Sequence, residues 1–338
     1  MRLLFSLLSN MLSHRKSTLF ITTSTDAASL NIYNHLVSKF QWATLTDESA
    51  AKKIYRSISR IDAIPPVYMW LINEPTIHVN YPEAKFIEDF RKLVSDDVHP
   101  DFDEILFLSR HAAASGTVSL TVHSIGIPWQ DDAVRSGGIP GRCTPPSSHI
   151  ASLYRSITSA TRIKGLDKTF QTSLEATHHG PYSTKPCCFV EIGSSETEWS
   201  NPDAGEIWAM CLGAHFYINP LEDALEDVDR EIVNNGLEQD SEEDKLSSEQ
   251  KLVIILIGGG HYIPKMSDIV KLGNNVYVGH ALATYALEEH LKAADGVETK
   301  ADEDIPRWQK IITEAVESTR ISFPVSCACT ILMQFLRS

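Results

Sequence analysis

The sequence predicts an α/β fold with three layers around a mainly parallel or mixed sheet. Short apolar runs alternate with helix-like segments along the 338 residues. Several of these runs end in glycine or histidine, which is typical of strand-to-helix turns in such folds. The hydrophobic content of 43% is enough to bury a sizeable core in one large domain or two.

The apolar runs are the predicted strands. Two of them, Val67 to Ile72 and Leu252 to Ile257, are apolar throughout, as in strands buried on both faces. The other predicted strands cover residues 19–21, 104–108, 118–122, 169–177, 187–192 and 276–278. Asp26, with Ser24 or Thr25, caps a helix that runs to about residue 40, and Pro202 opens another helix through Cys211. Further helices are predicted over residues 147–163, 264–272 and 280–291.

Residues 1–18 are predicted to be an extension and residues 19–338 one catalytic α/β domain, with two sub-domains as the alternative. The extension is either unstructured or a targeting segment, because residues 1–16 are basic, rich in serine and free of acids. Residues 221–250 hold twelve acidic residues against Arg230 and Lys245, a net charge of −10, which leaves −4 for the other 308 residues. This composition predicts a flexible acidic insertion, and we expect deletion of residues 224–248 to leave folding and catalysis nearly intact.

Composition also excludes some classes of protein. No apolar run reaches the ~20 residues that span a bilayer, so no membrane partner is expected. The six cysteines form no CxxC pair, which argues against a zinc ribbon and indicates reduced thiols in a cytoplasmic protein, with organelle targeting as the alternative. Between Arg135 and Lys185, seven basic residues face only Asp167 and Glu175, a net of +5. This segment, including Arg162 and Lys164, is either a surface for a nucleic-acid backbone or a solvated helix face.

Five histidines gather in four short motifs, each of which closes or follows an apolar run. The motifs are Ser109-Arg110-His111, Thr121-Val122-His123, Glu175-Ala176-Thr177-His178-His179-Gly180-Pro181 and Gly258-Gly259-Gly260-His261-Tyr262. Enzymes of the α/β class usually place their chemistry at the ends of such strands. A single histidine is more often structural than functional, but four such motifs together predict an active site.

Hydrolysis at neutral pH needs an activated water and a group that stabilises the developing oxyanion. Side chains of the right type for one or two zinc sites are His111, His123, His179, Glu191 and His261. Without metal, an imidazole oriented by a carboxylate acts as general base, and Glu175 either orients a histidine in this way or pairs with an arginine. The residues alone therefore predict a hydrolase or transferase, and they leave its substrate open.

The glycine motif is neither a Walker loop nor a dinucleotide fingerprint, because it lacks the lysine of the first and the last glycine of the second. Its backbone amides could meet a phosphate or an oxyanion, so Gly258, Gly259 and Gly260 are candidate substrate-binding residues, as is Arg110. The alternative is a tight turn without a ligand.

The same motifs resemble the archaeal and plant type of D-aminoacyl-tRNA deacylase over about residues 19–320. The most specific matching segments are Glu175 to Pro181 and Val190-Glu191-Ile192-Gly193-Ser194-Ser195-Glu196, followed by Trp199. The others are Ile21 to Ser29, Leu108 to His111, Leu120 to His123 and Gly259 to Tyr262. The acidic stretch and residues 322–338 depart from the family pattern.

This resemblance implies hydrolysis of the ester between a D-amino acid and the 3′ end of tRNA, as quality control of translation, with aldehyde-modified substrates included. It also implies two zinc ions, a fold similar to peptidyl-tRNA hydrolases and zinc exopeptidases, and D-aminoacyl-tRNA rather than DNA as the partner. The carried-over site contains His178 and Glu175 for the chemical step beside the five metal candidates. The alternatives are a zinc exopeptidase-like hydrolase and a relative made inactive by its altered C-terminus.

Overall fold

The computed structural model describes residues 17–61, 64–95, 100–113, 115–129, 136–221, 223, 225–232, 252–287, 305–323 and 328–333. In this part of the chain, nine strands form a mixed sheet in the order β2-β3-β4-β1-β5-β9-β6-β7, with β8 beside β6. The strands are β1 (Ser17–Thr23), β2 (Trp42–Thr44), β3 (Lys53–Ser57), β4 (Val67–Ile72), β5 (Phe102–Ala112), β6 (Ser119–Ile127), β7 (Arg142–Cys143), β8 (Gln171–His178) and β9 (Cys187–Ser194).

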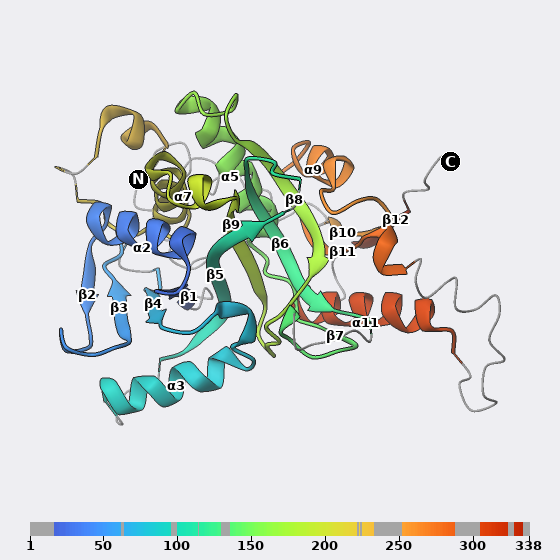
Figure 1. Cartoon of the computed structure of the whole chain (residues 1–338), viewed down its shortest axis with the longest axis horizontal. Coiled ribbons are helices and arrows are strands. Elements are labelled where there is room, and N and C mark those ends of the chain that lie inside the picture. Colours follow the sequence, from blue (N-terminus) through green and yellow to red (C-terminus); the bar gives the residue numbers. More distant parts are fainter. Residues whose placement is uncertain are drawn as a thin grey trace, which may run out of the picture.

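A smaller sheet completes the fold (Figure 1). Its three parallel strands are β10 (Leu252–Ile257), β11 (Val276–Leu282) and β12 (Ala328–Met333), in the order β11-β10-β12. The described helices are α2 (Ala27–Lys39), η1 (Thr76–His78), α3 (Pro82–Leu93), α5 (Ile150–Ile163), α6 (Glu196–Trp199), α7 (Pro202–His215), α9 (Pro264–Val270) and α11 (Arg307–Ser322). No helix among the described residues is long and apolar enough to cross a membrane.

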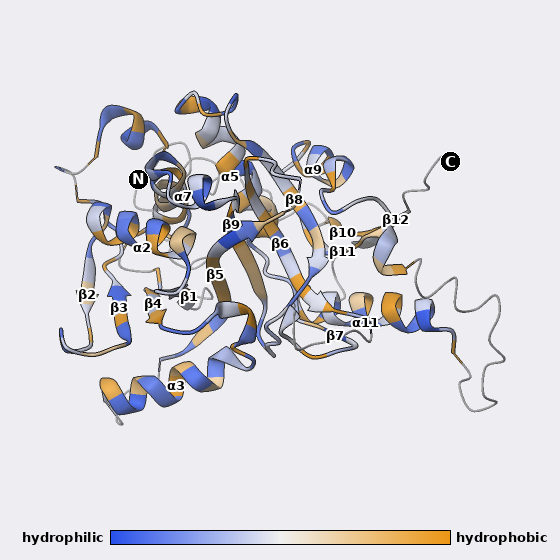
Figure 2. Cartoon of the chain, in the orientation of Figure 1, coloured by the Kyte–Doolittle hydropathy of each residue, from blue (hydrophilic) through white to orange (hydrophobic). Residues whose placement is uncertain are grey.

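Helices cover both faces of the large sheet, as predicted for an α/β fold (Figure 1). Side chains alternate between the faces of a strand, so each strand serves two different cores. On one face, residues such as Leu106, Val122 and Val190 pack in a large core with α2, α5 and α7. On the other face, Phe107 and Phe189 belong to a second core, which α3 closes with Phe86 and Phe90. Figure 2 shows the hydrophobic colours in β5 and β9 at the middle of the molecule and mixed colours along α3.

The predicted helix starts are confirmed where capping residues are present. The Asp26 carboxylate accepts hydrogen bonds from the amides of Ala28 and Ser29 and so caps α2. Ser195 and Glu198 form a capping box at α6, and Pro202 lies in the first turn of α7.

Three sequence predictions need correction. The strands β5 and β6 are longer than predicted, so His111 and His123 lie within them. The predicted helix from residue 280 is wrong at its start, because β11 continues through Leu282 in register with β10 and buries His280 in the strand. The acidic stretch is also not uniformly loose: Leu225, Asp229 and Ile232 are buried, while residues 233–250 lie outside the described residues.

Candidate active site

The histidine motifs converge on one face of the large sheet. Strands β5, β9, β6 and β8 are adjacent, and their register places His111 level with Gly193, and Glu175 level with His123 and Phe189. With side chains alternating along each strand, Glu191 points to this same face. The site therefore occupies a sheet face beside the aromatic core. His111 and His178 lie at the ends of their strands, as predicted, whereas His123 lies in the middle of β6.

Seven side chains form the resulting histidine cluster: His111, His123, Glu175, His178, His179, Glu191 and His261. All seven were predicted as site residues. Five come from the four central strands, His179 directly follows β8, and His261 follows β10. Because His261 comes from the smaller sheet, the cluster needs both sheets in place.

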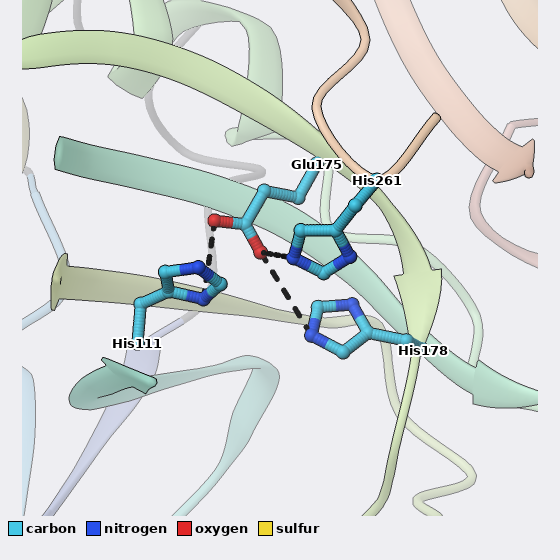
Figure 3. Close-up of side chains that lie close together, drawn as sticks. All are labelled: His111, Glu175, His178 and His261. Carbon is cyan, nitrogen blue, oxygen red and sulfur yellow. Dashed lines mark ion pairs between the residues drawn. The ribbon is translucent and has the colours of Figure 1, made fainter. Parts of the chain in front are cut away.

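Glu175 lies among three imidazoles (Figure 3). Its Oε2 is 3.1 Å from His261 Nε2 and 3.8 Å from His178 Nε2, and its Oε1 is 3.3 Å from His111 Nδ1. None of these contacts has hydrogen-bond geometry, so both Glu175 oxygens are buried without a donor. Burial without hydrogen bonds is unfavourable for a carboxylate unless a cation or a ligand compensates it.

Glu191 has a similar position beside the other histidines. Its Oε2 is 3.5 Å from His111 Nδ1 and 3.5 Å from His123 Nε2, and its Oε1 is 4.0 Å from His179 Nε2. Glu191 Oε2 and His123 Nε2 are also buried without a hydrogen-bond partner among the described residues. The cluster thus contains two carboxylates whose oxygens face imidazole nitrogens and no other donors.

Backbone carbonyls orient three of the rings. The Nδ1 atoms of His123, His178 and His179 lie 3.0, 2.7 and 2.6 Å from the carbonyl oxygens of Ser124, Ala176 and Gly180. An Nδ1–H that donates to a carbonyl leaves the Nε2 lone pair directed into the cluster, which is the usual arrangement of metal-binding histidines. His179 adopts a left-handed backbone conformation with a φ of 42°, so the chain turns there and the two adjacent histidines point into the same cluster.

Burial and neighbouring charge divide the histidines into two groups. Burial, together with the nearby His123, lowers the pKa of His178 well below its usual value and that of His179 to about 4. These two rings are therefore neutral at pH 7 and can offer a lone pair. Burial opposes the charged form of His111 and His123 too, but close contact with Glu191 outweighs it and raises the pKa of both. The same contacts outweigh the burial of Glu191 and lower its pKa.

Three overlapping groups in the cluster have donor atoms within 4.8 Å of one another, close enough to hold a metal ion. The groups are His111, Glu175, His178 and His261; His123, His178 and His179; and His123, Glu175 and Glu191. Mixed imidazole and carboxylate donors suit zinc and other divalent transition metals. The two residues assigned to the chemical step, Glu175 and His178, thus belong to the same metal-capable groups as the predicted ligands.

A cleft of about 370 Å³ opens beside the cluster. His111, His178, His179, Glu191 and His261 line it on one side. The lining also contains residues that the sequence analysis did not assign to the site: Thr23, Thr25, Asp26, Pro75, Thr76 and Ile77. The family resemblance gave a signal for Thr23, Thr25 and Asp26, within the segment Ile21 to Ser29, and no signal for residues 75–77.

Tyr262 is a further residue that the sequence analysis did not assign. Its hydroxyl lies 3.2 Å from His111 Nε2, the ring nitrogen that faces away from the carboxylates. The backbone around it is also tied to the cluster, because the carbonyl of His261 accepts a hydrogen bond from the Ala176 amide. The turn after β10 is therefore fixed against β8.

The predicted substrate-binding residues have different positions. Arg110 lines the cleft, as expected for a substrate contact. Two amides of the glycine turn are not free for an anion: the Gly258 amide donates to the Leu282 carbonyl and the Gly259 amide to Thr284 Oγ1. Both glycines have positive φ values of 101° and 91°, so they form a tight turn that carries His261 toward the cluster.

The prediction that Lys164 binds the substrate also needs correction. Lys164 pairs with Glu206 and lies 3.3 Å from Asp229, and its side chain is only 11% exposed. Lys39 lies 2.7 Å from Glu206 and 3.1 Å from Asp229, and we call these four residues the lysine cluster. Lys164 is thus part of the fold and is unavailable to a nucleic acid, whereas Arg162 at the end of α5 is exposed.

Comparison with known proteins identifies the family. Residues 98–323 match the family model for D-aminoacyl-tRNA deacylase. The D-aminoacyl-tRNA deacylase of Arabidopsis thaliana is 31% identical over 91% of this chain and 87% of its own length, and that of Aeropyrum pernix is 29% identical over 60% of this chain and 63% of its own. A crystal structure of a conserved protein of unknown function shares the fold, with a TM-score of 0.56, 24% identity and 95% of each chain covered. The chain therefore belongs to the D-aminoacyl-tRNA deacylase family.

Proposed function

We propose that this chain hydrolyses the ester between a D-amino acid and the 3′ end of tRNA, releasing both. The observation that carries the proposal is the histidine cluster, whose buried carboxylates lack hydrogen-bond donors and whose Glu191 and histidines line a cleft. Family membership supplies the substrate class. The proposal includes aldehyde-modified D-aminoacyl-tRNA and a role in the quality control of translation.

We further propose that the cluster holds zinc, with two ions per chain. The orphaned atoms His123 Nε2 and Glu191 Oε2 fit this role, because a bound cation would satisfy both of them. His111, His123, His179, Glu191 and His261 would hold the metal. When bound, zinc supplies Lewis acidity: it lowers the pKa of water to ~7 and offsets developing negative charge.

The protein's own side chains supply positioning and proton transfer. His178 Nε2 faces the cluster, and its lowered pKa keeps it neutral and ready to accept a proton from the attacking water. Glu175, with Oε2 at 3.8 Å, stabilises the imidazolium that forms. His178 can then return the proton to the ribose oxygen that leaves when the ester breaks. The walls of the cleft hold the ester next to these groups.

Release of labelled D-tyrosine from charged tRNA tests this function. We expect hydrolysis of D-tyrosyl-tRNA, little hydrolysis of L-tyrosyl-tRNA, loss of activity with a chelator and recovery with zinc. Metal analysis of the purified protein measures the identity and the number of ions. Full activity in metal-free protein would overturn the zinc proposal. His178 would then act as a general base without metal, supported by the Glu175 carboxylate. No release of D-tyrosine by zinc-loaded protein would overturn the function itself.

Several predictions from the sequence analysis remain proposals. They are the similarity of the fold to peptidyl-tRNA hydrolases and zinc exopeptidases, the single catalytic domain from residue 19, Arg162 as a tRNA contact and the cytoplasmic location. The possible targeting segment, residues 1–16, lies outside the described residues. Of the altered C-terminal segment, the structure describes residues 322 and 323 at the end of α11 and Ala328–Met333, which pairs with β10.

A further inference from the structure

Arg110 lies at the rim of the cleft, next to His111 in β5, with an exposed side chain. Among the described residues that line the cleft, it is the only lysine or arginine. Its guanidinium forms no ion pair within the described part of the chain, in contrast to Lys39 and Lys164. The Asp26 carboxylate is close enough to interact with this charge, but it forms no ion pair with the guanidinium, which is therefore suited to an anionic group of the substrate.

Trp199 supports this guanidinium. The guanidinium carbon lies 4.9 Å from the centre of the Trp199 ring, within the range of a cation–π contact. The indole is itself fixed, because its Nε1–H donates to the backbone carbonyl of His111 at 2.9 Å. Asn31 on α2 also donates to the Trp199 carbonyl. The stacked arginine is therefore attached through Trp199 to the backbone of a histidine in the cluster.

Asp26 fixes the backbone of Arg110 from the other side. Its Oδ2 accepts hydrogen bonds from the Arg110 amide and the Ser109 hydroxyl, both at 3.0 Å. Its Oδ1 accepts from the amides of Ala28 and Ser29 at the start of α2. Both carboxylate oxygens are thus engaged by other donors, and the guanidinium remains available to a ligand.

We propose that Arg110, stacked on Trp199, binds the phosphate that joins the last two nucleotides of the tRNA. This inference rests on the proposed function. The ester to be hydrolysed is on the terminal ribose, and the 5′-phosphate of that nucleoside is the formal negative charge nearest to it along the chain. Arginine presents a planar fork of donors that matches two phosphate oxygens. Binding there would place the terminal ribose at a fixed distance from the histidine cluster.

The amino-acid end of the substrate is a poor partner for Arg110. In an aminoacyl ester the carboxyl group is esterified and carries no charge, and the α-amino group is a cation that an arginine repels. The phosphate contact also cannot select D over L, because the tRNA is the same in both substrates. Arg110 therefore contributes to placing the ester, and chiral selection belongs to other walls of the cleft.

The test uses two intact D-tyrosyl-tRNA substrates and the zinc-loaded enzyme. One tRNA is native, and in the other the last internucleotide phosphate is a neutral methylphosphonate. For the wild-type enzyme we expect kcat/KM to fall about tenfold or more on the neutral linkage, since a charge-assisted hydrogen bond is lost. Arg110→Gln should lose the same amount on native tRNA and show no further loss on the neutral linkage. Arg110→Lys keeps the charge but loses the planar fork, so its kcat/KM on native tRNA should lie between those of the wild type and Arg110→Gln.

Controls separate this role from a structural one. Arg91→Gln, an exposed arginine of α3 away from the cleft, should keep the wild-type ratio between the two substrates. Trp199→Leu should reduce the ratio of kcat/KM on native tRNA to kcat/KM on the neutral linkage more than Trp199→Phe does, because phenylalanine keeps an aromatic face for the guanidinium. A methylphosphonate placed one linkage earlier should leave the ratio of Arg110→Gln equal to that of the wild type.

Two results would overturn the proposal while the proposed function stands. One is a wild-type enzyme that hydrolyses native and neutral substrates equally well. The other is an Arg110→Gln variant that is as sensitive to the neutral linkage as the wild type. A zinc-loaded wild-type enzyme that leaves native D-tyrosyl-tRNA intact would instead refute the proposed function.

Discussion

The molecule contains two buried clusters of charged side chains, and they are satisfied to different degrees. In the lysine cluster, Lys39 and Lys164 each face both Glu206 and Asp229, so two positive and two negative charges balance, and of these four side chains only Asp229 has a buried oxygen, Oδ1, without a hydrogen bond. In the histidine cluster, Glu175 and Glu191 face imidazoles in contacts that leave three of their oxygens without a hydrogen-bond donor.

The pKa directions follow the same division. Burial opposes the charged forms of Lys39 and Glu206, yet their mutual contact raises the pKa of Lys39 and lowers that of Glu206, so both stay ionised. In the histidine cluster, His178 and His179 have lowered pKa values and remain neutral beside the carboxylates. Buried charges that balance one another are compatible with a purely structural role, whereas several buried acceptors without hydrogen-bond donors indicate a ligand site. The comparison therefore assigns the first cluster to folding and the second to function.

Removing a carboxylate from the histidine cluster should have the largest effect on activity. For Glu191→Gln we expect kcat/KM for D-tyrosyl-tRNA to fall by about a thousandfold, more than the ~100-fold typical of residues that only orient metal ligands. Zinc content should fall in parallel, while the free energy of unfolding of the metal-free protein changes less than in the Asp229 variant below. Kinetics, metal analysis and chemical denaturation measure the three quantities. Retention of zinc and activity would place the metal elsewhere.

Breaking the lysine cluster should have the opposite signature. Asp229→Ala leaves two half-buried lysines facing a single carboxylate, which should lower the free energy of unfolding by about 2 kcal/mol. Below the unfolding transition, kcat/KM should stay close to the wild-type value. Adding Lys164→Met to Asp229→Ala should recover part of the lost stability, because the charge imbalance is removed.

Deletion of residues 224–248 should resemble Asp229→Ala. The sequence-based expectation was that this segment is dispensable, but it contains Leu225, Asp229 and Ile232, which are buried. We therefore expect the deletion to reduce stability, as measured by chemical denaturation. Deletion of residues 234–248 alone, which spares these three side chains, is the matched control and should cost less. Equal stability of the two deletion variants would contradict the packing seen at Asp229.

The sequence predicted the components of the histidine cluster but not its geometry. Short polar motifs after apolar runs indicate chemistry whatever the order of the strands, so all seven residues could be named. Their placement depends on β6, which lies antiparallel to β9 and parallel to β8. That pairing brings Glu175 level with His123 in the middle of the sheet, and periodicity within one strand carries no information about it.

The lysine cluster was not predictable for a related reason. Lys164 and Asp229 are far apart in the sequence, and each lies in a segment whose composition indicates a solvated surface. Only the packing of α2, α5 and α7 brings them together. The misassigned strand at His280 is similar: Gly279-His280 looks like a helix start, but pairing with β10 decides the conformation.

His280 provides a smaller effect on stability, with a defined pH dependence. Burial lowers its pKa to about 3, below the usual value of 6.5, and its Nδ1 lies 3.0 Å from Thr177 Oγ1. The unfolded chain therefore binds a proton that the folded chain does not, so stability is present above pH 6.5 and is lost as the pH falls. Between pH 7 and pH 5, this one group should cost about 2 kcal/mol. His280→Asn, which can still accept from Thr177, should lose that much less stability over the same interval. Identical pH profiles for the two proteins would show that His280 is protonated in the fold.

The smallest expected effect compares Arg162 with Lys164, near the end of the same helix. Arg162 is exposed and Lys164 is paired, so charge reversal should act on binding at the first position and on folding at the second. Arg162→Glu should change the free energy of unfolding by less than about 0.5 kcal/mol. Its binding of charged tRNA should weaken about threefold at low salt, equally for D- and L-aminoacyl forms, with a salt dependence shallower by about one unit. Lys164→Glu should instead reduce the yield of folded protein, because it adds a third carboxylate to the lysine cluster.

A salt titration of tRNA binding measures the effect of Arg162→Glu, and chemical denaturation measures the effect of Lys164→Glu. Unchanged binding by Arg162→Glu at every salt concentration would leave Arg162 as a solvated side chain and place the tRNA path on another surface.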